Sequence, residues 1–144
     1  MITFVSADGI ALPKKRRWIR SWLDEVAAQH QARIGHLSYA FGSSAWMADL
    51  NQEFLNHAGD TDILTFDYSE SPQNRLIQGE CCISPTMIRE QAQVWGVSFE
   101  DEMHRVLVHG LLHLLGYNDK TDQEKVVMRK LEEEALEIRS RIKA

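Results

Sequence analysis

His109-Gly-Leu-Leu-His113-Leu-Leu-Gly116-Tyr-Asn-Asp119 places two histidines four residues apart, followed by a glycine and a carboxylate. A step of four residues turns an α-helix by about 400°, so His109 and His113 share one face, one turn apart. Gly116 is suited to ending that helix in a left-handed conformation, after which the chain can return and bring Asp119 beside the imidazoles. The stretch therefore predicts His109, His113 and Asp119 as metal ligands with a fourth tetrahedral position open, which is typical of a catalytic zinc.

The residues around the two histidines favour a bound metal over a pair of ordinary core or surface histidines. Two imidazoles without partners would be costly to bury in so apolar a segment, and a metal ion removes that cost. Asp119 has a second interpretation, because Asn-Asp after a glycine is also common turn chemistry. The apolar flanks are Val106, Leu107, Val108, Leu111, Leu112, Leu114 and Leu115.

The residue after the first histidine indicates which hydrolysis the site favours. Metzincin zinc proteases share this ligand frame with a third histidine, and zincin proteases carry a glutamate directly after the first histidine as general base. Gly110 occupies that place, so peptide hydrolysis by the standard route lacks its base. Arg105, four residues before His109 on the same face, is suited to holding a phosphate or stabilising charge on phosphorus. Its alternative is an ordinary ion pair with Asp101 or Glu102.

Length, charge and hydropathy predict one cytosolic domain over residues 1–144. The chain is long enough for one sizeable core, and its apolar and charged fractions are those of an ordinary globular protein. It contains no apolar run of membrane-spanning length and no signal-peptide pattern, so we expect no membrane partner. The net charge of −5 argues against a globally basic nucleic-acid binder. We interpret the basic segments 14–20 and 139–143 and the acidic run 132–134 as solvated helix faces.

The two cysteines, Cys81 and Cys82, are adjacent. In a strand they point to opposite faces, which disfavours an internal disulfide. No cysteine pair has the spacing of zinc ligands, so a cysteine-based zinc site is excluded. We interpret both residues as small apolar side chains.

Hydrophobic periodicity predicts an α+β fold in which the histidine helix packs between a sheet and the other helices. Capping boxes at Ser98 with Asp101 and at Thr121 with Glu124 mark the starts of the last two helices. About four strands are expected, at residues 2–6, 36–41, 63–68 and 76–84, with a hairpin loop at 69–75. About five helices are expected, at residues 13–31, from 43 or 44 to 55, 85–96, from 98 through the histidines, and from 121 onward.

Apolar stripes indicate which helical residues face the core. Trp18 and Trp22 lie on the stripe of the first helix, so we expect them in the core and not on a surface that stacks bases. The inward residues of the last helix are expected to be Val127, Leu131, Ala135, Ile138 and Ile142.

The segment His109 to Tyr117 resembles the signature of the YbeY family of bacterial endoribonucleases, which reads His-Gly-x-Leu-His-Leu-x-Gly-Tyr-Asp-His. A second match is Leu50-Asn51 followed by Thr61 to Phe66, where the family has Leu-Asn and then Thr-Asp-Val-Leu-Ser-Phe at the same distance. A third is Gly79-Glu80, where the family tends to have Gly-Asp, and Met128 also matches after the signature. The matches run in order from about residue 50 to 128.

The resemblance implies a zincin-like fold and a metal-dependent cut in single-stranded RNA. It implies work on ribosomal RNA, notably the 3′ end of the 16S small-subunit RNA, and a part in ribosome quality control. It further implies one zinc ion, a cytoplasmic location, and ribosomal RNA with ribosomal and ribosome-assembly proteins as partners.

Three positions depart from the family pattern. Asp119 replaces the third histidine, Asn118 replaces the preceding aspartate, and Leu55 aligns with an arginine associated with catalysis in the family. An aspartate ligand is acceptable for zinc, although its negative charge makes bound water less acidic. It also makes harder, oxygen-preferring divalent metals more competitive.

The departures shape the expected catalytic residues. We hypothesise that Arg105 takes over the missing guanidinium role, because it shares a helix face with both histidines. Asp62, at a matched family position, is a candidate for proton transfer, with a β-turn or backbone-capping role as its alternative. His57 is a weaker candidate and is expected to be a loop residue. The residues do not distinguish attack by water from attack by the ribose 2′-hydroxyl.

Two other functions stay open at the level of sequence. The ligand frame also fits a metalloprotease or amidohydrolase, although Gly110 weakens that hypothesis. The absence of the family arginine at Leu55 favours a non-catalytic ribosome-assembly factor whose metal only shapes a surface.

Overall fold

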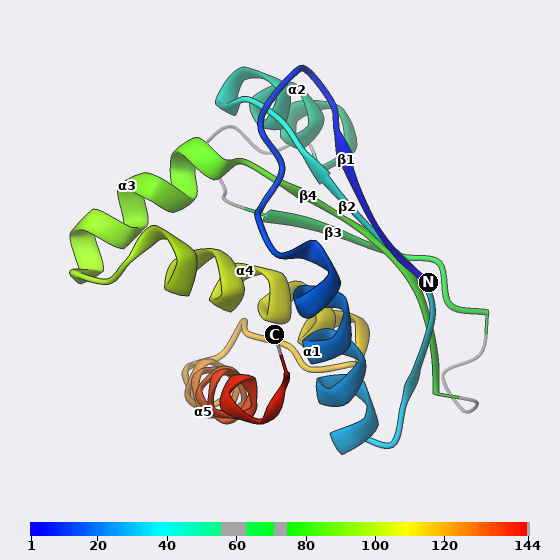
Figure 1. Ribbon diagram of the computed structural model, residues 1–144. Helices are drawn as coiled ribbons and strands as arrows, with labels where there is room; N and C mark the ends of the chain where they lie inside the picture. The colour runs from blue at the N-terminus through cyan, green and yellow to red at the C-terminus, as the bar shows by residue number, and fades with distance from the viewer. Residues whose placement is uncertain (56–62, 71–74, 144) are drawn as a thin grey trace.

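The computed structural model describes residues 1–55, 63–70 and 75–143, which form a four-stranded mixed sheet with helices packed on both faces (Figure 1). β1, β2 and β4 are parallel, and β3 runs antiparallel to β4, as the predicted hairpin requires. All four predicted strands are confirmed. The strands are β1 (Ile2–Ser6), β2 (Arg33–Phe41), β3 (Ile63–Asp67) and β4 (Leu76–Ile83), in the order β1-β2-β4-β3.

The predicted helices are also present, with one clear error at the first boundary. We expected a helix from Pro13, but α1 begins at Arg16 because Lys15 adopts a left-handed backbone (φ 59°) that cannot continue a right-handed helix. β2 begins at Arg33 and not at His36, because a register shift between Ile34 and His36 breaks the alternation of its sequence. The helices are α1 (Arg16–Gln29), α2 (Ser44–Leu55), α3 (Pro85–Trp95), α4 (Phe99–Leu114) and α5 (Asp122–Ile138), followed by the 3-10 turn η2 (Arg139–Arg141).

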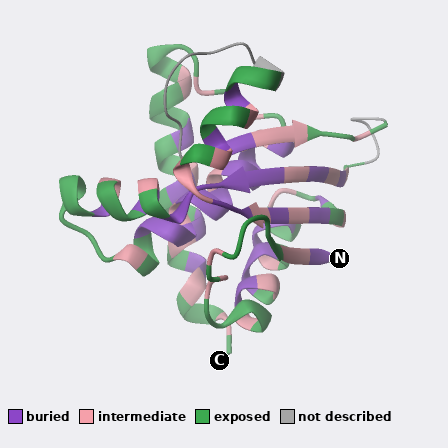
Figure 2. Ribbon diagram, turned by 90° about the horizontal axis from the view of Figure 1, so that it is seen from above, coloured by how far each residue is buried: buried purple, intermediate pink, exposed green. Residues whose placement is uncertain are grey.

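The histidine helix α4 lies in the middle of the protein. It packs against β3 and β4 on one side and against α1, α3 and α5 on the others. The buried residues accordingly gather along the central strands and the helices beneath them (Figure 2). This arrangement confirms the prediction that a helix apolar on nearly all sides occupies the centre of the fold. No helix in the described part of the chain is long and apolar enough to cross a membrane.

Cys81 and Cys82 point to opposite faces of β4, as their adjacency predicts. Cys81 belongs to the main core, whereas Cys82 packs with Met47 of α2 and Leu64 of β3 in a smaller cluster on the other face. Burial raises the pKa of both thiols to about 12, so they stay protonated and behave as small apolar side chains. Neither forms a disulfide.

The tryptophans of α1 join that helix to the C-terminal part of the chain. Trp22 is fully buried and donates its indole N–H to the Ala135 carbonyl at 2.8 Å, and Trp18 donates to the Ile142 carbonyl at 3.1 Å. The predicted core placement is confirmed for Trp22, while Trp18 is half-buried and packs against the core. The prediction that Val127 faces inward is wrong, because its side chain is 49% exposed and the inward position is taken by Met128.

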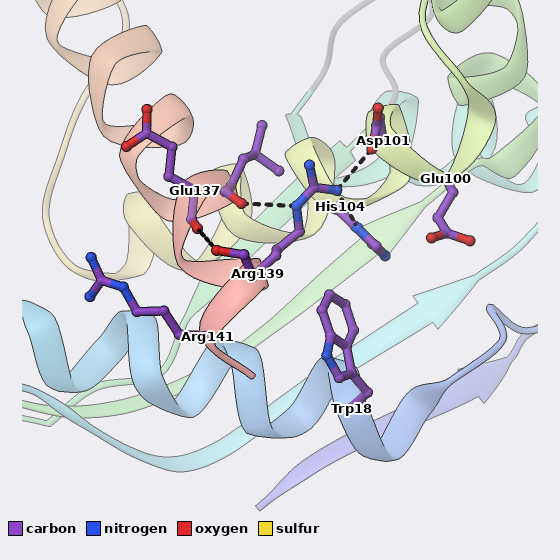
Figure 3. A pocket seen from close by; sticks show the side chains of 9 residues that line it. Trp18, Glu100, Asp101, His104, Glu137, Arg139 and Arg141 are labelled. Carbon is purple, nitrogen blue, oxygen red and sulfur yellow. Dashed lines mark hydrogen bonds and ion pairs between the residues drawn. The ribbon is translucent and has the colours of Figure 1, made fainter. Parts of the chain in front are cut away.

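His104 of α4 is buried beside a hollow of about 750 Å³, which lies apart from the predicted metal ligands (Figure 3). The Arg139 guanidinium donates through Nη1 to His104 Nδ1 and to Asp101 Oδ1, both at 2.9 Å. The ring centroids of Trp18 and Trp22 each lie 5.3 Å from the centroid of the imidazole. Burial first, and then the charge of Arg139, lower the pKa of His104 to about 4. The imidazole is therefore held neutral with Nδ1 as an acceptor.

We expect acid to destabilise the protein through His104. Its folded pKa of about 4 lies below the ordinary value of 6.5, so the unfolded chain binds this proton first and stability is lost as pH falls from about 6.5 towards 4. At 1.36 kcal/mol per pKa unit, the loss between pH 7 and pH 4.5 is about 2 to 3 kcal/mol. Urea unfolding at both pH values in the presence of a chelator measures it. The variant His104→Gln should lose far less stability on acidification, and an equal loss in both proteins would contradict this assignment.

Candidate metal centre

The predicted ligand helix ends as its sequence indicates. Gly116 adopts a positive φ of 108°, its N–H donates to the His113 carbonyl at 3.0 Å, and the Tyr117 N–H donates to the Leu112 carbonyl at 3.1 Å. These two bonds form a Schellman motif, which satisfies the last carbonyls of α4 and turns the chain back along it. Asp119 is thereby brought to the face that carries the histidines.

A second capping motif limits the loop on its other side. The Thr121 hydroxyl accepts from the Glu124 N–H at 3.0 Å, and the Thr121 N–H donates to the Glu124 carboxylate at 2.9 Å. This confirms the predicted capping box and starts α5 directly after the Asp119 loop. At the start of α4, Ser98 accepts from the Asp101 N–H at 3.0 Å, while the Asp101 carboxylate pairs with Arg139.

The three predicted ligands come together at one point. The Nε2 atoms of His109 and His113 are 3.0 Å apart, and Asp119 Oδ2 lies 3.3 Å from the first and 3.5 Å from the second. Ligand atoms about 2.0–2.1 Å from a tetrahedral zinc ion lie about 3.3 Å from one another. Within the described ranges this is the one cluster of three or more side chains suited to a metal ion. The donor set and its spacing therefore fit a divalent cation with an open coordination position.

Glu132 of α5 orients the first ligand. Its Oε2 lies 2.6 Å from His109 Nδ1, so the imidazole donates its Nδ1–H to the carboxylate and leaves the Nε2 lone pair towards His113 and Asp119. A carboxylate behind a ligating histidine fixes its tautomer and raises its basicity as a ligand. For His113, burial first and then His109 lower the pKa, which favours the neutral form that binds metal.

Arg105 lies on the histidine face, but its guanidinium is engaged with α5. Its Nη1 donates to Glu132 Oε1 at 3.0 Å and its Nη2 donates to Glu133 Oε1 at 2.6 Å. The alternative that we considered, an ion pair with Asp101 or Glu102, is replaced by ion pairs with two glutamates of a different helix. The arginine holds the carboxylate that in turn holds His109.

The interpretation of residues 132–134 as a solvated face is wrong for Glu132. Its side chain is 7% exposed, whereas the neighbouring Glu133 and Glu134 are exposed. Glu132 is the functional residue that sequence reasoning missed. Its position four residues after buried Met128 and three before buried Ala135 places it on the inward face of α5, and this spacing could have identified it.

Gly110 faces the sheet and not the ligands. A Cβ at this position would lie 2.7 Å from Cys81 Sγ and 2.9 Å from Ile63 Cδ1, so even alanine would collide with β4 and β3. A side chain at the place where zincin proteases carry their general base would therefore require Cys81 and Ile63 to move. Gly79 in β4 is similar, because a Cβ there would lie 2.7 Å from the Leu114 side chain of α4.

Two of the predicted ligands, His109 and Asp119, line a cavity of about 280 Å³ between α3, α4 and α5. Its wall includes Arg105, His109, Asp119 and Glu132 together with Trp95 and Arg129. Asp62, the other expected catalytic residue, and the weaker candidate His57 lie outside the described residues, as does the side chain of Leu55.

Fold and site together define a small α+β protein with a candidate metal centre, formed by His109 and His113 of the central helix α4 and by Asp119 of the loop that follows it. The sequence profile described as Endoribonuclease YbeY matches residues 2–139. The chain therefore belongs to the YbeY endoribonuclease family, a family of hydrolases, and the predicted resemblance is confirmed.

Individual relatives cover nearly the whole chain. The endoribonuclease YbeY of Porphyromonas gingivalis is 40% identical over 131 residues, which are 90% of this chain and 85% of the relative. That of Cytophaga hutchinsonii is 42% identical over 126 residues, covering 88% and 87%. The solution structure of TM1509 from Thermotoga maritima is 27% identical with a TM-score of 0.65, covering 98% of this chain and 93% of that one. This similarity confirms the predicted α+β fold.

Proposed function

We propose that this protein is a metal-dependent endoribonuclease that cuts single-stranded RNA. The observation that carries the proposal is the cluster of His109, His113 and Asp119, oriented by Glu132, in a chain of this family. We propose further that it matures ribosomal RNA, including the 3′ end of the 16S RNA, and serves ribosome quality control in the cytoplasm. Its partners would be ribosomal RNA and ribosomal and assembly proteins, and residues 1–144 would act as one metallohydrolase domain.

Each residue of the site has a defined task in this proposal. His109 and His113 present neutral Nε2 atoms and Asp119 presents one carboxylate oxygen, so the three hold one divalent cation, for which zinc is the first candidate. The cation supplies Lewis-acid polarisation of a phosphoryl oxygen when it is bound. Glu132 keeps His109 in the ligating tautomer, and Arg105 keeps Glu132 in place. The charge of Asp119 favours oxygen-preferring metals as competitors of zinc.

Arg105 and Asp62 are proposed as the catalytic residues. A phosphate contact by Arg105 would use guanidinium N–H groups other than those on Glu132 and Glu133, since Nη1 and Nη2 each already donate one bond. Asp62 is proposed for proton transfer on the strength of its matched position in the motif 61–66. Replacing Asp62 by asparagine keeps its shape and removes the acid–base group.

The decisive experiment is cleavage of a labelled RNA by purified protein of measured metal content. We expect cuts in single-stranded regions, none in a perfect duplex, and loss of activity with a chelator that returns when zinc is restored. A 2′,3′-cyclic phosphate at the products would identify the ribose 2′-hydroxyl as the attacking group. Absence of any metal-dependent cleavage in a fully metal-loaded preparation would falsify the nuclease assignment.

One observation favours a second candidate, a non-catalytic assembly factor. Leu55 stands where the family pattern has its arginine. The two functions differ in a cell depleted of its own enzyme: a His113→Ala variant that binds no metal yet restores ribosomal RNA processing would support the assembly factor. The protease alternative has no comparable support, because Gly110 stands where zincin proteases carry the general base.

A further inference from the structure

A large aromatic side chain is exposed beside the metal-binding residues. Trp95, the last residue of α3, is 64% exposed, in contrast to the fully buried Trp22. Its side chain lines the same cavity as His109 and Asp119. Trp95 therefore places an exposed ring at the edge of the candidate site, with no role in the hydrophobic core.

Arg129 accompanies this ring from a different helix. Its guanidinium carbon lies 5.8 Å from the Trp95 ring centroid, and its Nε is 3.7 Å from Glu133 Oε1. The side chain is 54% exposed, and within the described ranges its two Nη groups donate no hydrogen bond. Arg105, by contrast, has both Nη groups on carboxylates. Arg129 is thus the cavity guanidinium whose two Nη groups are both available to a ligand.

The charge of the cavity makes its affinity for anions depend on the cation. Three carboxylates, Glu102, Asp119 and Glu132, face two guanidiniums, Arg105 and Arg129. The wall is net negative on its own and becomes net positive when a divalent cation is bound. A bound divalent cation therefore strengthens the attraction of the cavity for a polyanion, while the indole ring offers a contact to uncharged planar groups.

We propose that Trp95 and Arg129 form the element that holds single-stranded RNA at the metal centre. The indole stacks on an unpaired base next to the bond to be cut, and Arg129 donates to the neighbouring phosphate. This rests on the proposed nuclease function and adds a physical reason for single-strand selectivity. Bases in a duplex are already stacked on one another, and only an unpaired base can be placed on the ring.

The test is equilibrium binding of metal-loaded protein to a single-stranded 2′-O-methyl oligonucleotide, which lacks the free 2′-hydroxyl and is checked for integrity after each titration. Loss of base stacking should raise the Kd of Trp95→Ala at least about tenfold. Trp95→Phe retains a ring and should bind within about threefold of wild type. The matched control is Val94→Ala, because Val94 is 80% exposed on the same helix end and does not line the cavity.

Arg129 gives an independent readout. Binding of the oligonucleotide by Arg129→Ala should weaken and should depend less steeply on salt. The slope of the logarithm of the binding constant against the logarithm of the salt concentration should fall in magnitude by about one, whereas Arg129→Lys should keep the wild-type slope. Trp95→Ala with unchanged metal content and unchanged Kd would overturn the inference. If wild-type protein cuts RNA and Trp95→Ala cuts it with the same KM, the nuclease function stands and this binding element falls. If a protein partner binds and RNA does not, the inference also falls.

Discussion

Replacing Asp119 by alanine is expected to remove most of the bound metal and to lower RNA cleavage at least about a hundredfold. The carboxylate supplies one of three ligand atoms that lie 3.0–3.5 Å from one another, and two histidines alone hold a divalent cation weakly. The cation contributes several kcal/mol of transition-state stabilisation, and each 1.4 kcal/mol is about tenfold in rate. Metal analysis of the purified variant and a cleavage time course measure the two effects.

Asp119→His is the informative companion to this variant. It restores the histidine of the family pattern, so zinc binding should persist while one negative charge leaves the site. The acidic limb of the cleavage pH profile should then move to lower pH, because a site of three neutral imidazoles carries more positive charge. An unaltered metal content in Asp119→Ala would refute Asp119 as the third ligand. If Asp119→Ala kept its full metal content but did not cleave RNA, Asp119 would take part in the cleavage reaction and would not be a metal ligand.

The metal ligands could be predicted because their geometry is local. His109 and His113 are related by one helical turn, and the Gly116 turn brings Asp119 back within a few residues. The interaction of Glu132 with His109 depends on how α5 packs against α4, and no spacing within one helix encodes that distance. For the same reason the sequence placed Arg105 on the helix face of the two histidines but did not identify Glu132 and Glu133 as its partners.

The fold shows the same division between local and nonlocal information. Alternation and capping signals identified the strands and helices, but the left-handed Lys15 and the register shift near Gly35 moved two boundaries. The strand order β1-β2-β4-β3 was not predicted, because the parallel pairs join residues more than 30 positions apart. Val127 was misplaced because the inward position of α5 is taken by the next residue, Met128, while Val126 and Val127 are both exposed.

Replacing Glu132 by alanine is expected to damage both stability and metal binding. The change leaves the Nδ1–H of His109 and one Nη group of Arg105 without their carboxylate in a buried setting. Removing one partner of a buried ion pair lowers the unfolding free energy by about 3 kcal/mol or more. Because Glu133 still pairs with Arg105, we expect Glu132→Ala to lose about 3 kcal/mol. Loss of a carboxylate behind a ligating histidine lowers metal affinity by about 10- to 100-fold.

Matched variants separate the contributions of Glu132 and Arg105. Glu134→Ala, two residues away and exposed, should change unfolding free energy by less than about 0.5 kcal/mol. Glu132→Gln keeps an acceptor for His109 without the charge, so its metal affinity should lie between wild type and Glu132→Ala.

Arg105→Ala should weaken metal binding as Glu132→Ala does. If cleavage by Arg105→Ala stays low at saturating metal and Arg105→Lys restores it, the arginine contacts phosphate. If saturating metal restores cleavage fully, Arg105 acts only by positioning Glu132, and its proposed catalytic role is excluded.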